Sequence, residues 1–491
     1  MLTTLLFVHA FLVQHIGGSP TTDKLQSTAT IPLTLTPADS CTDIDGCRTR
    51  YNIIWSSLVT ILACVWTAVH RNIPEPAKAE ESRLRHVAAR VLEVAKIVVV
   101  TLLAPEWVLA WAVRQLLNAR AFGKELEDAR DEAARAWKTK RWVDEREGRG
   151  GSAGADKGER IPMRHRYLKR QAFDGSSLAV DEGAGRMRGR WTTRHWFFVI
   201  MGGFHYYEEG EPKHPLSREN VLGLVKTGDL VPPADDEIRG WSQGDALSKT
   251  LAVVQTLWFV IQCIARRVEG LPIMQLEVMT LAYTIMTVAM YAAWWDKPQN
   301  VGSPVRVVVK KLPESELPQL EHPQWYEWVF VVTAGWQDIF VDLRTHPRVP
   351  TFYGGGTNSD LNDTYADVIA SGAAMVFGAV HCAAWNYAFP SRAEQLLWRI
   401  SSVAIVVLPG AMLVSMVLMI ITNRVSTYPD RTLDTVIDLS VNIVPPLFLF
   451  SGPIYVAARL LLLTLSFTTL RSLPYEAYRA VQWTVFIPHF T

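Results

Sequence analysis

The sequence predicts an all-α fold: a polytopic helical membrane protein with about seven transmembrane helices, interrupted segments and a small ordered loop subdomain. The chain has 491 residues, of which 49% are hydrophobic. The apolar residues stand in blocks of about 20 between charged stretches, which is the length that a membrane-crossing helix needs. Lysine and arginine number 49 against 48 acidic residues, and this balance argues against a nucleic-acid partner.

The amino terminus has the pattern of a signal peptide. Residues 1–18 contain a short apolar run that ends in Gly17 and Gly18, which are small enough for signal peptidase. The run lacks a basic start, so an uncleaved anchor is the alternative. Residues 19–50 form a Ser- and Thr-rich tail that a signal peptide would deliver outside the cytoplasm. In that oxidising environment, Cys41 and Cys47 are predicted to form a disulfide.

Seven apolar blocks carry the membrane prediction. The first span and a second block lie within residues 51–116, two spans form a hairpin within 249–297, and the remaining helices lie within 366–470. The last apolar stretch contains Pro445-Pro446 and Pro453. We therefore expect a half-helix or membrane-dipping segment up to Phe450, followed by a full span. Such a break is tolerated where neighbouring protein satisfies the backbone.

The second block, Val94 to Val113, leaves two topologies open. It has Pro105-Glu106 at its middle and basic residues on both sides. These flanks favour a segment that enters and leaves on one side, whereas its length also allows a crossing. The choice decides the side of Asn362, the single glycosylation sequon. A crossing makes Asn362 lumenal and able to carry a glycan, and a re-entrant block leaves it bare in the cytoplasm.

The loops divide into flexible and ordered parts. Residues 117–190 are charged and predicted to be flexible, except for a solvated helix at Glu125–Trp142, where charges alternate in sign at helical spacing. Residues 191–248 are expected to form an ordered subdomain in which Ser217 caps a short helix. The loop 298–365 contains a second predicted surface helix, Trp325–Leu343, and residues 471–491 form a tail.

Polar side chains inside the apolar segments form the candidate site, because ionisable groups are costly there and usually face inward. On the third span, Gln255, Gln262 and Arg266 share one helix face. Glu277 begins the next span at about the depth of Arg266, and we expect these two residues to pair. Such a pair would clamp the hairpin, and the functional alternative is that it binds a ligand or an ion.

Two further residues complete the predicted cluster. Glu106 follows Pro105, which frees a backbone carbonyl, so its carboxylate is expected either in a wet site or paired with an arginine. His381 lies inside the fifth span, either as a hydrogen-bonded core residue or as a proton relay. The polar intramembrane cluster is therefore Glu106, Gln255, Gln262, Arg266, Glu277 and His381.

The sequence contains no convincing motif of a soluble enzyme. It lacks the glycine patterns that bind dinucleotides or phosphates, paired-cysteine zinc motifs and a two-histidine zinc helix. We therefore predict no cofactor and no metal site, and the sequence leans away from an enzyme. No catalytic residue is identified.

Several short motifs together resemble a known family. They are Cys47–Thr49, Val69–Pro74, Ala104–Glu106, Met201–Phe204, Gly244–Lys249, His381–Asn386, Leu397–Ser402 and Ile487–Phe490. As an ordered set they resemble uncharacterised multi-pass integral membrane proteins of filamentous and mushroom-forming fungi, over about residues 41–491 except 123–190. The resemblance implies a fungal membrane protein and supplies no catalytic residues. Arg71 departs from the family pattern, where proline is commoner, which affects only that loop.

Three functions remain open. The first is small-molecule or ion transport or sensing through the inward-facing polar cluster, because broken helices often line binding sites. The second is a membrane receptor or scaffold that docks partners through its long loop. The third is a membrane-embedded enzyme for a lipid or terpenoid-like substrate, with Glu106 or Glu277 as acid or base. The expected location is the lipid bilayer of the endoplasmic reticulum or plasma membrane. The expected ligand is a small molecule, and the sequence does not identify a protein partner.

Overall fold

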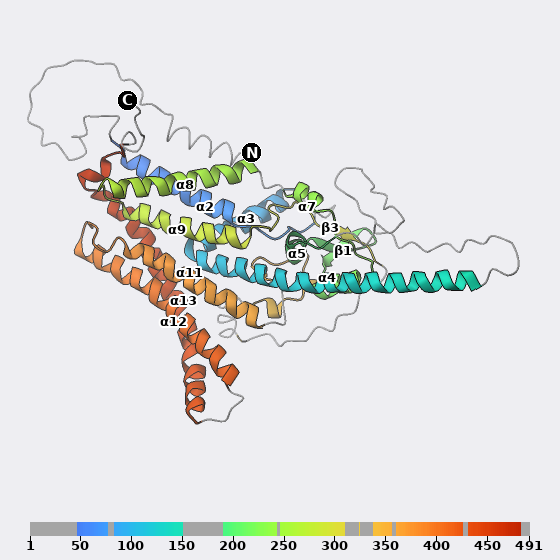
Figure 1. Ribbon diagram of the computed structural model, residues 1–491. Helices are drawn as coiled ribbons and strands as arrows, with labels where there is room; N and C mark the ends of the chain where they lie inside the picture. Colours follow the sequence, from blue (N-terminus) through green and yellow to red (C-terminus); the bar gives the residue numbers. More distant parts are fainter. Residues whose placement is uncertain are drawn as a thin grey trace, which may run out of the picture.

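The computed structural model describes residues 47–76, 83–150, 190–242, 246–309, 324, 337–355, 360–425 and 431–482. These residues form a bundle of long helices with a small α/β subdomain at one end (Figure 1). The predicted signal peptide, the linker 151–189 and most of the predicted surface helix Trp325–Leu343 lie outside the described residues.

Six helices of the described chain are long and apolar enough to cross a membrane, which suggests a membrane protein. They are α2 (Arg50–Ala68), α8 (Ala246–Val268), α9 (Gln275–Ala293), α11 (Asp360–Cys382), α12 (Arg392–Val425) and α13 (Arg431–Thr468). About seven spans were predicted. The difference is the second apolar block, which is divided between two helices.

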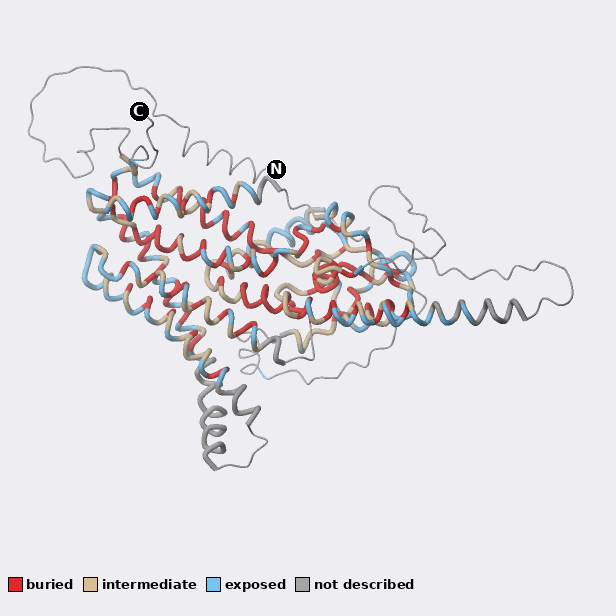
Figure 2. The backbone as a smooth tube through the Cα atoms, in the orientation of Figure 1, coloured by how far each residue is buried: buried red, intermediate tan, exposed pale blue. Residues whose placement is uncertain are grey.

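The six helices differ in how far they are buried. In α9, 67% of the apolar window is buried inside the bundle, whereas in α8 only 33% is, and Figure 2 shows the same contrast along the two helices. The side chains of Val254, Leu257, Ile261 and Ile264 are exposed on α8 at helical spacing, so they share one face. An exposed apolar face of this kind is compatible with contact with lipid.

The last two helices differ from the sequence prediction. α13 continues through Pro445-Pro446 and Pro453 as one helix, and α12 likewise continues through Pro409. A proline inside a helix removes one backbone hydrogen bond and bends the helix, but the flanking turns can hold it together. The predicted half-helix ending at Phe450 is therefore wrong, while the apolar span Phe450–Arg471 contains the predicted full span.

The second apolar block folds as two helices, α3 (Arg83–Leu103) and α4 (Pro105–Gly150), broken at Ala104. Pro105 lacks a backbone N–H and suits the first position of a helix, so one helix ends and the next begins there. At the break, the carbonyl of Leu102 accepts a hydrogen bond from the hydroxyl of Tyr283, in the middle of α9. The break therefore lies inside the bundle.

Both arms of the α3–α4 hairpin lie at one end of the bundle. Trp111 of α4 packs edge-on against Trp294, just past the end of α9, with 4.9 Å between ring centroids. Half-way along α3, Glu93 pairs with Arg348, and the nearby Phe352 packs on Trp111 at 5.2 Å. In this fold the second block is thus a hairpin with both arms at the same end of the bundle, which is the arrangement that a re-entrant segment requires.

Contacts between the spans fix their directions. The Sδ atom of Met279 on α9 lies 3.3 Å from Nε2 of His381 on α11, and Tyr283 packs on Phe377, one turn earlier on α11. The residue numbers rise on one helix as they fall on the other, so α9 and α11 are antiparallel.

The bundle has two ends, which we name after residues at them. The Cys47 end holds the first turn of α9 and the described carboxyl-terminal residues, because Cys47 forms an antiparallel bridge with Arg479. The Lys297 end holds the arms of the hairpin and the first turn of α11. Asn362 lies in that turn. The two predicted modification sites, at Cys47 and at Asn362, are therefore at opposite ends.

The loop subdomain is built around a three-stranded sheet. β1 (Phe204–Glu208) lies between β2 (Glu211–Pro215), which is antiparallel to it, and β3 (Val305–Val307), which is parallel. The hairpin turn between β1 and β2 has positive φ at Glu209 and Gly210, the conformation that matches the twist of paired strands. β3 comes from the loop after α9, so the subdomain reaches beyond the stretch predicted from sequence.

Three short helices accompany the sheet: α5 (Thr193–Ile200), α6 (Arg218–Lys226) and α7 (Asp235–Trp241). Ser217 caps α6, as predicted, by accepting a hydrogen bond from the backbone N–H of Asn220 at 3.2 Å. Phe122 and Leu126 of α4 belong to the same buried core as the subdomain. The long helix α4 therefore ties the subdomain to the hairpin.

Candidate functional site

The structure does not bring the predicted polar cluster together in one place. Arg266 and Glu277 lie at the Cys47 end, whereas Gln255 lies between α8 and α2. Glu106 and His381 pack inside the bundle. Gln262 is half-buried on α8.

At the Cys47 end the expected partners are exchanged. Glu277 pairs with Arg48, whose Nη1 lies 2.5 Å from a carboxylate oxygen. Arg266 instead donates to backbone carbonyls, among them that of Arg479 at 2.7 Å. The predicted ion pair between Arg266 and Glu277 is therefore wrong, because Arg48, far away in the sequence, folds onto the carboxylate. These contacts tie the hairpin to both ends of the described chain and form a structural clamp.

Gln255 and His381 take part in helix packing. The side-chain amide of Gln255 donates to the hydroxyl of Thr60 at 3.2 Å, which links α8 to α2. The Nδ1 atom of His381 lies 2.8 Å from the carbonyl of Phe377, and Nε2 faces Met279. Both ring nitrogens of His381 are thus occupied, as in a core histidine.

Glu106 is the predicted residue that lies at the break between α3 and α4. It is the second residue of α4, at the tip of the hairpin, where a helix amino terminus favours a carboxylate. The guanidinium of Arg459 and the hydroxyl of Tyr455, both from α13, act on it. Glu106 and Arg459 interact electrostatically but form no direct ion pair. We call Glu106, Tyr283, Tyr455 and Arg459 the hairpin-tip centre.

Arg459 holds the broken end of α3. It is only 3% exposed, and its Nε and Nη2 atoms donate to the carbonyls of Leu103 and Leu102, each at 3.1 Å. The guanidinium also lies 3.8 Å from the ring centroid of Phe377, a cation–π contact. The carbonyls that a helix end leaves free are therefore satisfied by a side chain from α13.

Sequence analysis missed Arg459. A cation in the middle of an apolar span is by itself a sign of an inward-facing functional residue, and that signal was present in the last span. Its partners could not be read from sequence, since α3 and α13 lie far apart in the chain. Tyr283 and Tyr455 carried no distinguishing signal among the many aromatic residues.

Three buried atoms of the hairpin-tip centre make no hydrogen bond of good geometry among the described residues, although the Tyr455 hydroxyl lies close enough to act on the Glu106 carboxylate. They are Oε2 of Glu106, Oη of Tyr455 and Nη1 of Arg459. Leaving a buried polar atom unpaired costs about 1–3 kcal/mol, so a group of such atoms in one place is a candidate for a functional role. A carboxyl, a phenol and a guanidinium together can bind and release a proton or a small polar species.

A second buried charge lies at the Lys297 end. Nζ of Lys297 donates to Oε1 of Gln115 at 2.8 Å and to the carbonyl of His70, and it lies 4.8 Å from the ring centroids of Trp111 and Trp294. Burial lowers the pKa of the Lys297 ammonium well below its usual value. Through these contacts, Lys297 links three segments: the loop after α2, the helix α4 and the end of α9.

The remaining predicted sites are described only in part. Cys47 is disulfide-bonded, but Cys41 lies outside the described residues, so their pairing stays a prediction. The side chain of Asn362 is also outside the described residues, and its glycosylation likewise stays a prediction. Where side chains are described, no group of three or more His, Cys, Asp or Glu residues is placed to hold a metal ion.

Comparison with known proteins identifies a family but no activity. The sequence pattern of a family of unknown function, DUF8562, matches residues 34–157, 159–317 and 344–490. No curated protein and no solved structure matches the chain.

Proposed function

The chain belongs to the DUF8562 family of unknown function, and we propose from its hairpin-tip centre that it transports or senses a small polar solute or ion. In this proposal the protein is integral to a membrane of the secretory pathway. The hairpin-tip centre binds the transported or sensed species, and Glu106 is the group that gains and loses a proton.

One observation carries the proposal: buried polar atoms of Glu106, Tyr455 and Arg459, which lack hydrogen bonds of good geometry, converge at the tip of the α3–α4 hairpin. Interrupted helices place free backbone groups and charges inside a membrane protein, and they often line its solute or ion sites. An arginine with a purely structural role would be expected to donate all of its hydrogen bonds within the bundle, but Nη1 of Arg459 has no acceptor there.

The geometry also supplies a way to couple binding to movement. Arg459 holds the end of α3 through two carbonyls and interacts electrostatically with Glu106 at the start of α4. Protonation or ligation of Glu106 removes this attraction, so the balance between Arg459 and the two arms of the hairpin changes. A hairpin that is held mainly by one neighbouring helix can take two positions, one for each state of Glu106.

The proposal includes an orientation. Residues near the Lys297 end include Arg71, Arg83, Arg85 and Arg90 and the charged loop after residue 117, so the positive-inside rule places this end in the cytoplasm. The Cys47 end, with the predicted disulfide, then faces the oxidising side. A six-span bundle with a re-entrant hairpin satisfies both conditions.

The test is proton flux through the full chain reconstituted in phosphatidylcholine liposomes that contain a pH-sensitive dye. A potassium gradient with valinomycin supplies the driving potential. We expect faster acidification than in empty liposomes and a loss of most of this rate in Glu106→Gln, because an amide does not carry the proton. Equal rates in wild-type and empty liposomes would exclude proton transport as the activity.

The matched control is Glu476→Gln. Glu476 is an exposed carboxylate at the Cys47 end, outside the hairpin-tip centre, so its removal should leave the flux unchanged. An equal loss in both variants would show that the flux depends on overall charge or on folding, and it would contradict the role given to Glu106.

A further inference from the structure

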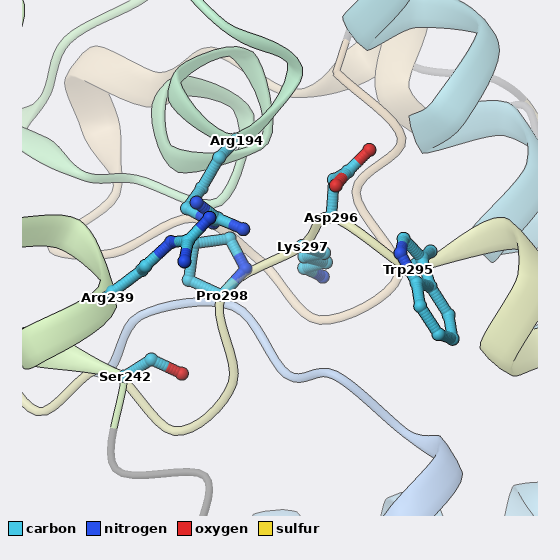
Figure 3. Close-up of a pocket in the computed structure, with 7 residues that line it drawn as sticks. All are labelled: Arg194, Arg239, Ser242, Trp295, Asp296, Lys297 and Pro298. Atoms are coloured by element: carbon cyan, nitrogen blue, oxygen red, sulfur yellow. The ribbon is translucent and has the colours of Figure 1, made fainter. Parts of the chain in front are cut away.

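A polar pocket of about 310 Å³ lies where the loop subdomain meets the end of α9 (Figure 3). It is separate from the hairpin-tip centre, and no step of the proposed function uses it. Its walls come from α5, α7 and the segment after α9, and the residues that line it are Arg194, Arg239, Ser242, Trp295, Asp296, Lys297 and Pro298.

The two arginines of the pocket share one acidic neighbour, and the other acidic residue of the lining, Asp296, stands apart from them. Arg194 and Arg239 share the carboxylate of Asp235, at 2.5 Å and 3.1 Å. Arg239 donates to it through Nε alone, which leaves both of its terminal amino groups available, and its side chain is 64% exposed. In Figure 3 the two guanidinium groups lie next to each other, and the carboxylate of Asp296 points away from them.

The pocket opens close to the level where the membrane surface is expected. α9 ends at Ala293, so the lining segment begins two residues past the end of an apolar span. Trp295 in this segment is 81% exposed, as is typical of a tryptophan that anchors in the headgroup layer. Lys297 directs its ammonium into the bundle, toward Gln115. The part of Lys297 that lines the pocket is therefore its uncharged aliphatic portion.

We propose that this pocket binds the phosphate of an anionic membrane lipid. Paired arginines match the oxygens of a phosphate group through parallel hydrogen bonds, and a pocket beside a span keeps the acyl chains within the bilayer. The orientation proposed above places it at the cytoplasmic leaflet, which is rich in anionic lipids. A soluble phosphate would offer the same group without the chains, so the test must separate the two sources.

The experiment uses the full chain in a neutral detergent and isothermal titration calorimetry. The probes are dioctanoyl phosphatidylinositol 4-phosphate, dioctanoyl phosphatidylcholine and inorganic phosphate. We expect binding of the first probe alone. Arg239→Gln should weaken it about tenfold, the loss expected for one charge-assisted contact. Because Arg239 is exposed and Arg194 keeps its bond to Asp235, this variant should fold, which an unchanged unfolding temperature would verify.

Lys226→Gln is the matched control, since Lys226 is another exposed cation of the same subdomain away from the pocket, and its affinity should equal that of the wild type. Equal affinity for the neutral lipid, or no change in Arg239→Gln, would overturn the proposal. Binding of inorganic phosphate with the same dependence on Arg239 would overturn the lipid as the source and identify a soluble phosphate ligand instead.

Discussion

The carboxylate of Glu106 and the guanidinium of Arg459 act on each other inside the bundle without forming a direct ion pair. Arg459 uses two of its nitrogens on the carbonyls of Leu102 and Leu103. The break between α3 and α4 thus depends on a residue of α13, and the carboxylate at the tip depends on the same residue.

Replacing Arg459 with methionine should lower the free energy of unfolding by about 3–5 kcal/mol, as for other buried charges that lose a partner. The change leaves two carbonyls unpaired and Glu106 without its cation. Adding Glu106→Gln should recover part of the loss, because the uncompensated carboxylate is then gone. Thermal unfolding of the purified protein in detergent measures both effects. Identical midpoints for the single and double variants would show that the two residues do not interact.

At the Cys47 end, a double-mutant cycle should distinguish the two arginines. We expect a coupling energy of about 1–3 kcal/mol between Arg48 and Glu277, since their side chains are 2.5 Å apart. The cycle between Arg266 and Glu277 should give a smaller value, because Arg266 bonds to backbone carbonyls. Unfolding of the single and double methionine variants measures both couplings. A larger coupling for Arg266 would contradict the observed pairing.

The loop subdomain should lose stability in acid through His205. This residue is 2% exposed, and burial, with a smaller effect of His214, lowers its pKa from 6.5 to about 4. At a pH between about 4 and 6.5, His205 therefore binds a proton in the unfolded chain but not in the folded chain. The stabilisation is complete above about pH 6.5 and falls as the pH drops toward 4, by at most about 3 kcal/mol.

Hydrogen exchange of residues 204–208 between about pH 7.5 and pH 5, corrected for intrinsic exchange, measures this loss. In His205→Phe the subdomain should keep only the weaker pH dependence that His195 contributes, because burial also lowers the pKa of the His195 imidazole. His346→Phe, which changes a histidine outside the subdomain core, should keep the wild-type dependence. A pH-independent wild type would contradict the assignment to His205.

Glycosylation mapping tests the orientation. Asn362 should carry no glycan, because the proposed orientation places it in the cytoplasm. Thr28→Asn creates the sequon Asn-Ala-Thr in the amino-terminal tail, which should be glycosylated on the opposite side. Mobility before and after N-glycosidase treatment reads out both sites. A shift in the wild type that disappears in Asn362→Gln would reverse the proposed orientation.

Deletions along α4 should separate its packed part from its projecting part. Leu126 and Ala129 are 0% and 2% exposed and belong to the subdomain core, so removing residues 123–136 should unfold the subdomain. Removing 137–150 should leave it folded. Circular dichroism and limited proteolysis compare the two. If the second deletion keeps the fold but abolishes binding of a protein partner, the receptor or scaffold alternative would gain support over transport.

Sequence patterns were sufficient for properties that depend on local composition. Hydropathy identified the segments that form the six apolar helices, because a span must be long and apolar wherever it packs. The Pro105 break and the Ser217 cap were also readable, since a proline lacks a backbone donor and a serine hydroxyl replaces one missing partner at a helix start. The prolines of α13 were misread, because surrounding turns can carry a helix across a proline.

The tertiary structure decided which side chains contact each other. Arg48, and not Arg266, forms the ion pair with Glu277. Arg459 donates hydrogen bonds to the end of α3. Both contacts join segments that are distant in the sequence, so local residue spacing could not predict them. The hairpin shape of the second block likewise follows only from its contacts with α9, because a broken apolar block has the same composition whether it crosses or returns. The sequence by itself determined which segments are apolar and where charges stand. Only packing decided which charges meet, since the interaction between two charges depends on their separation in space.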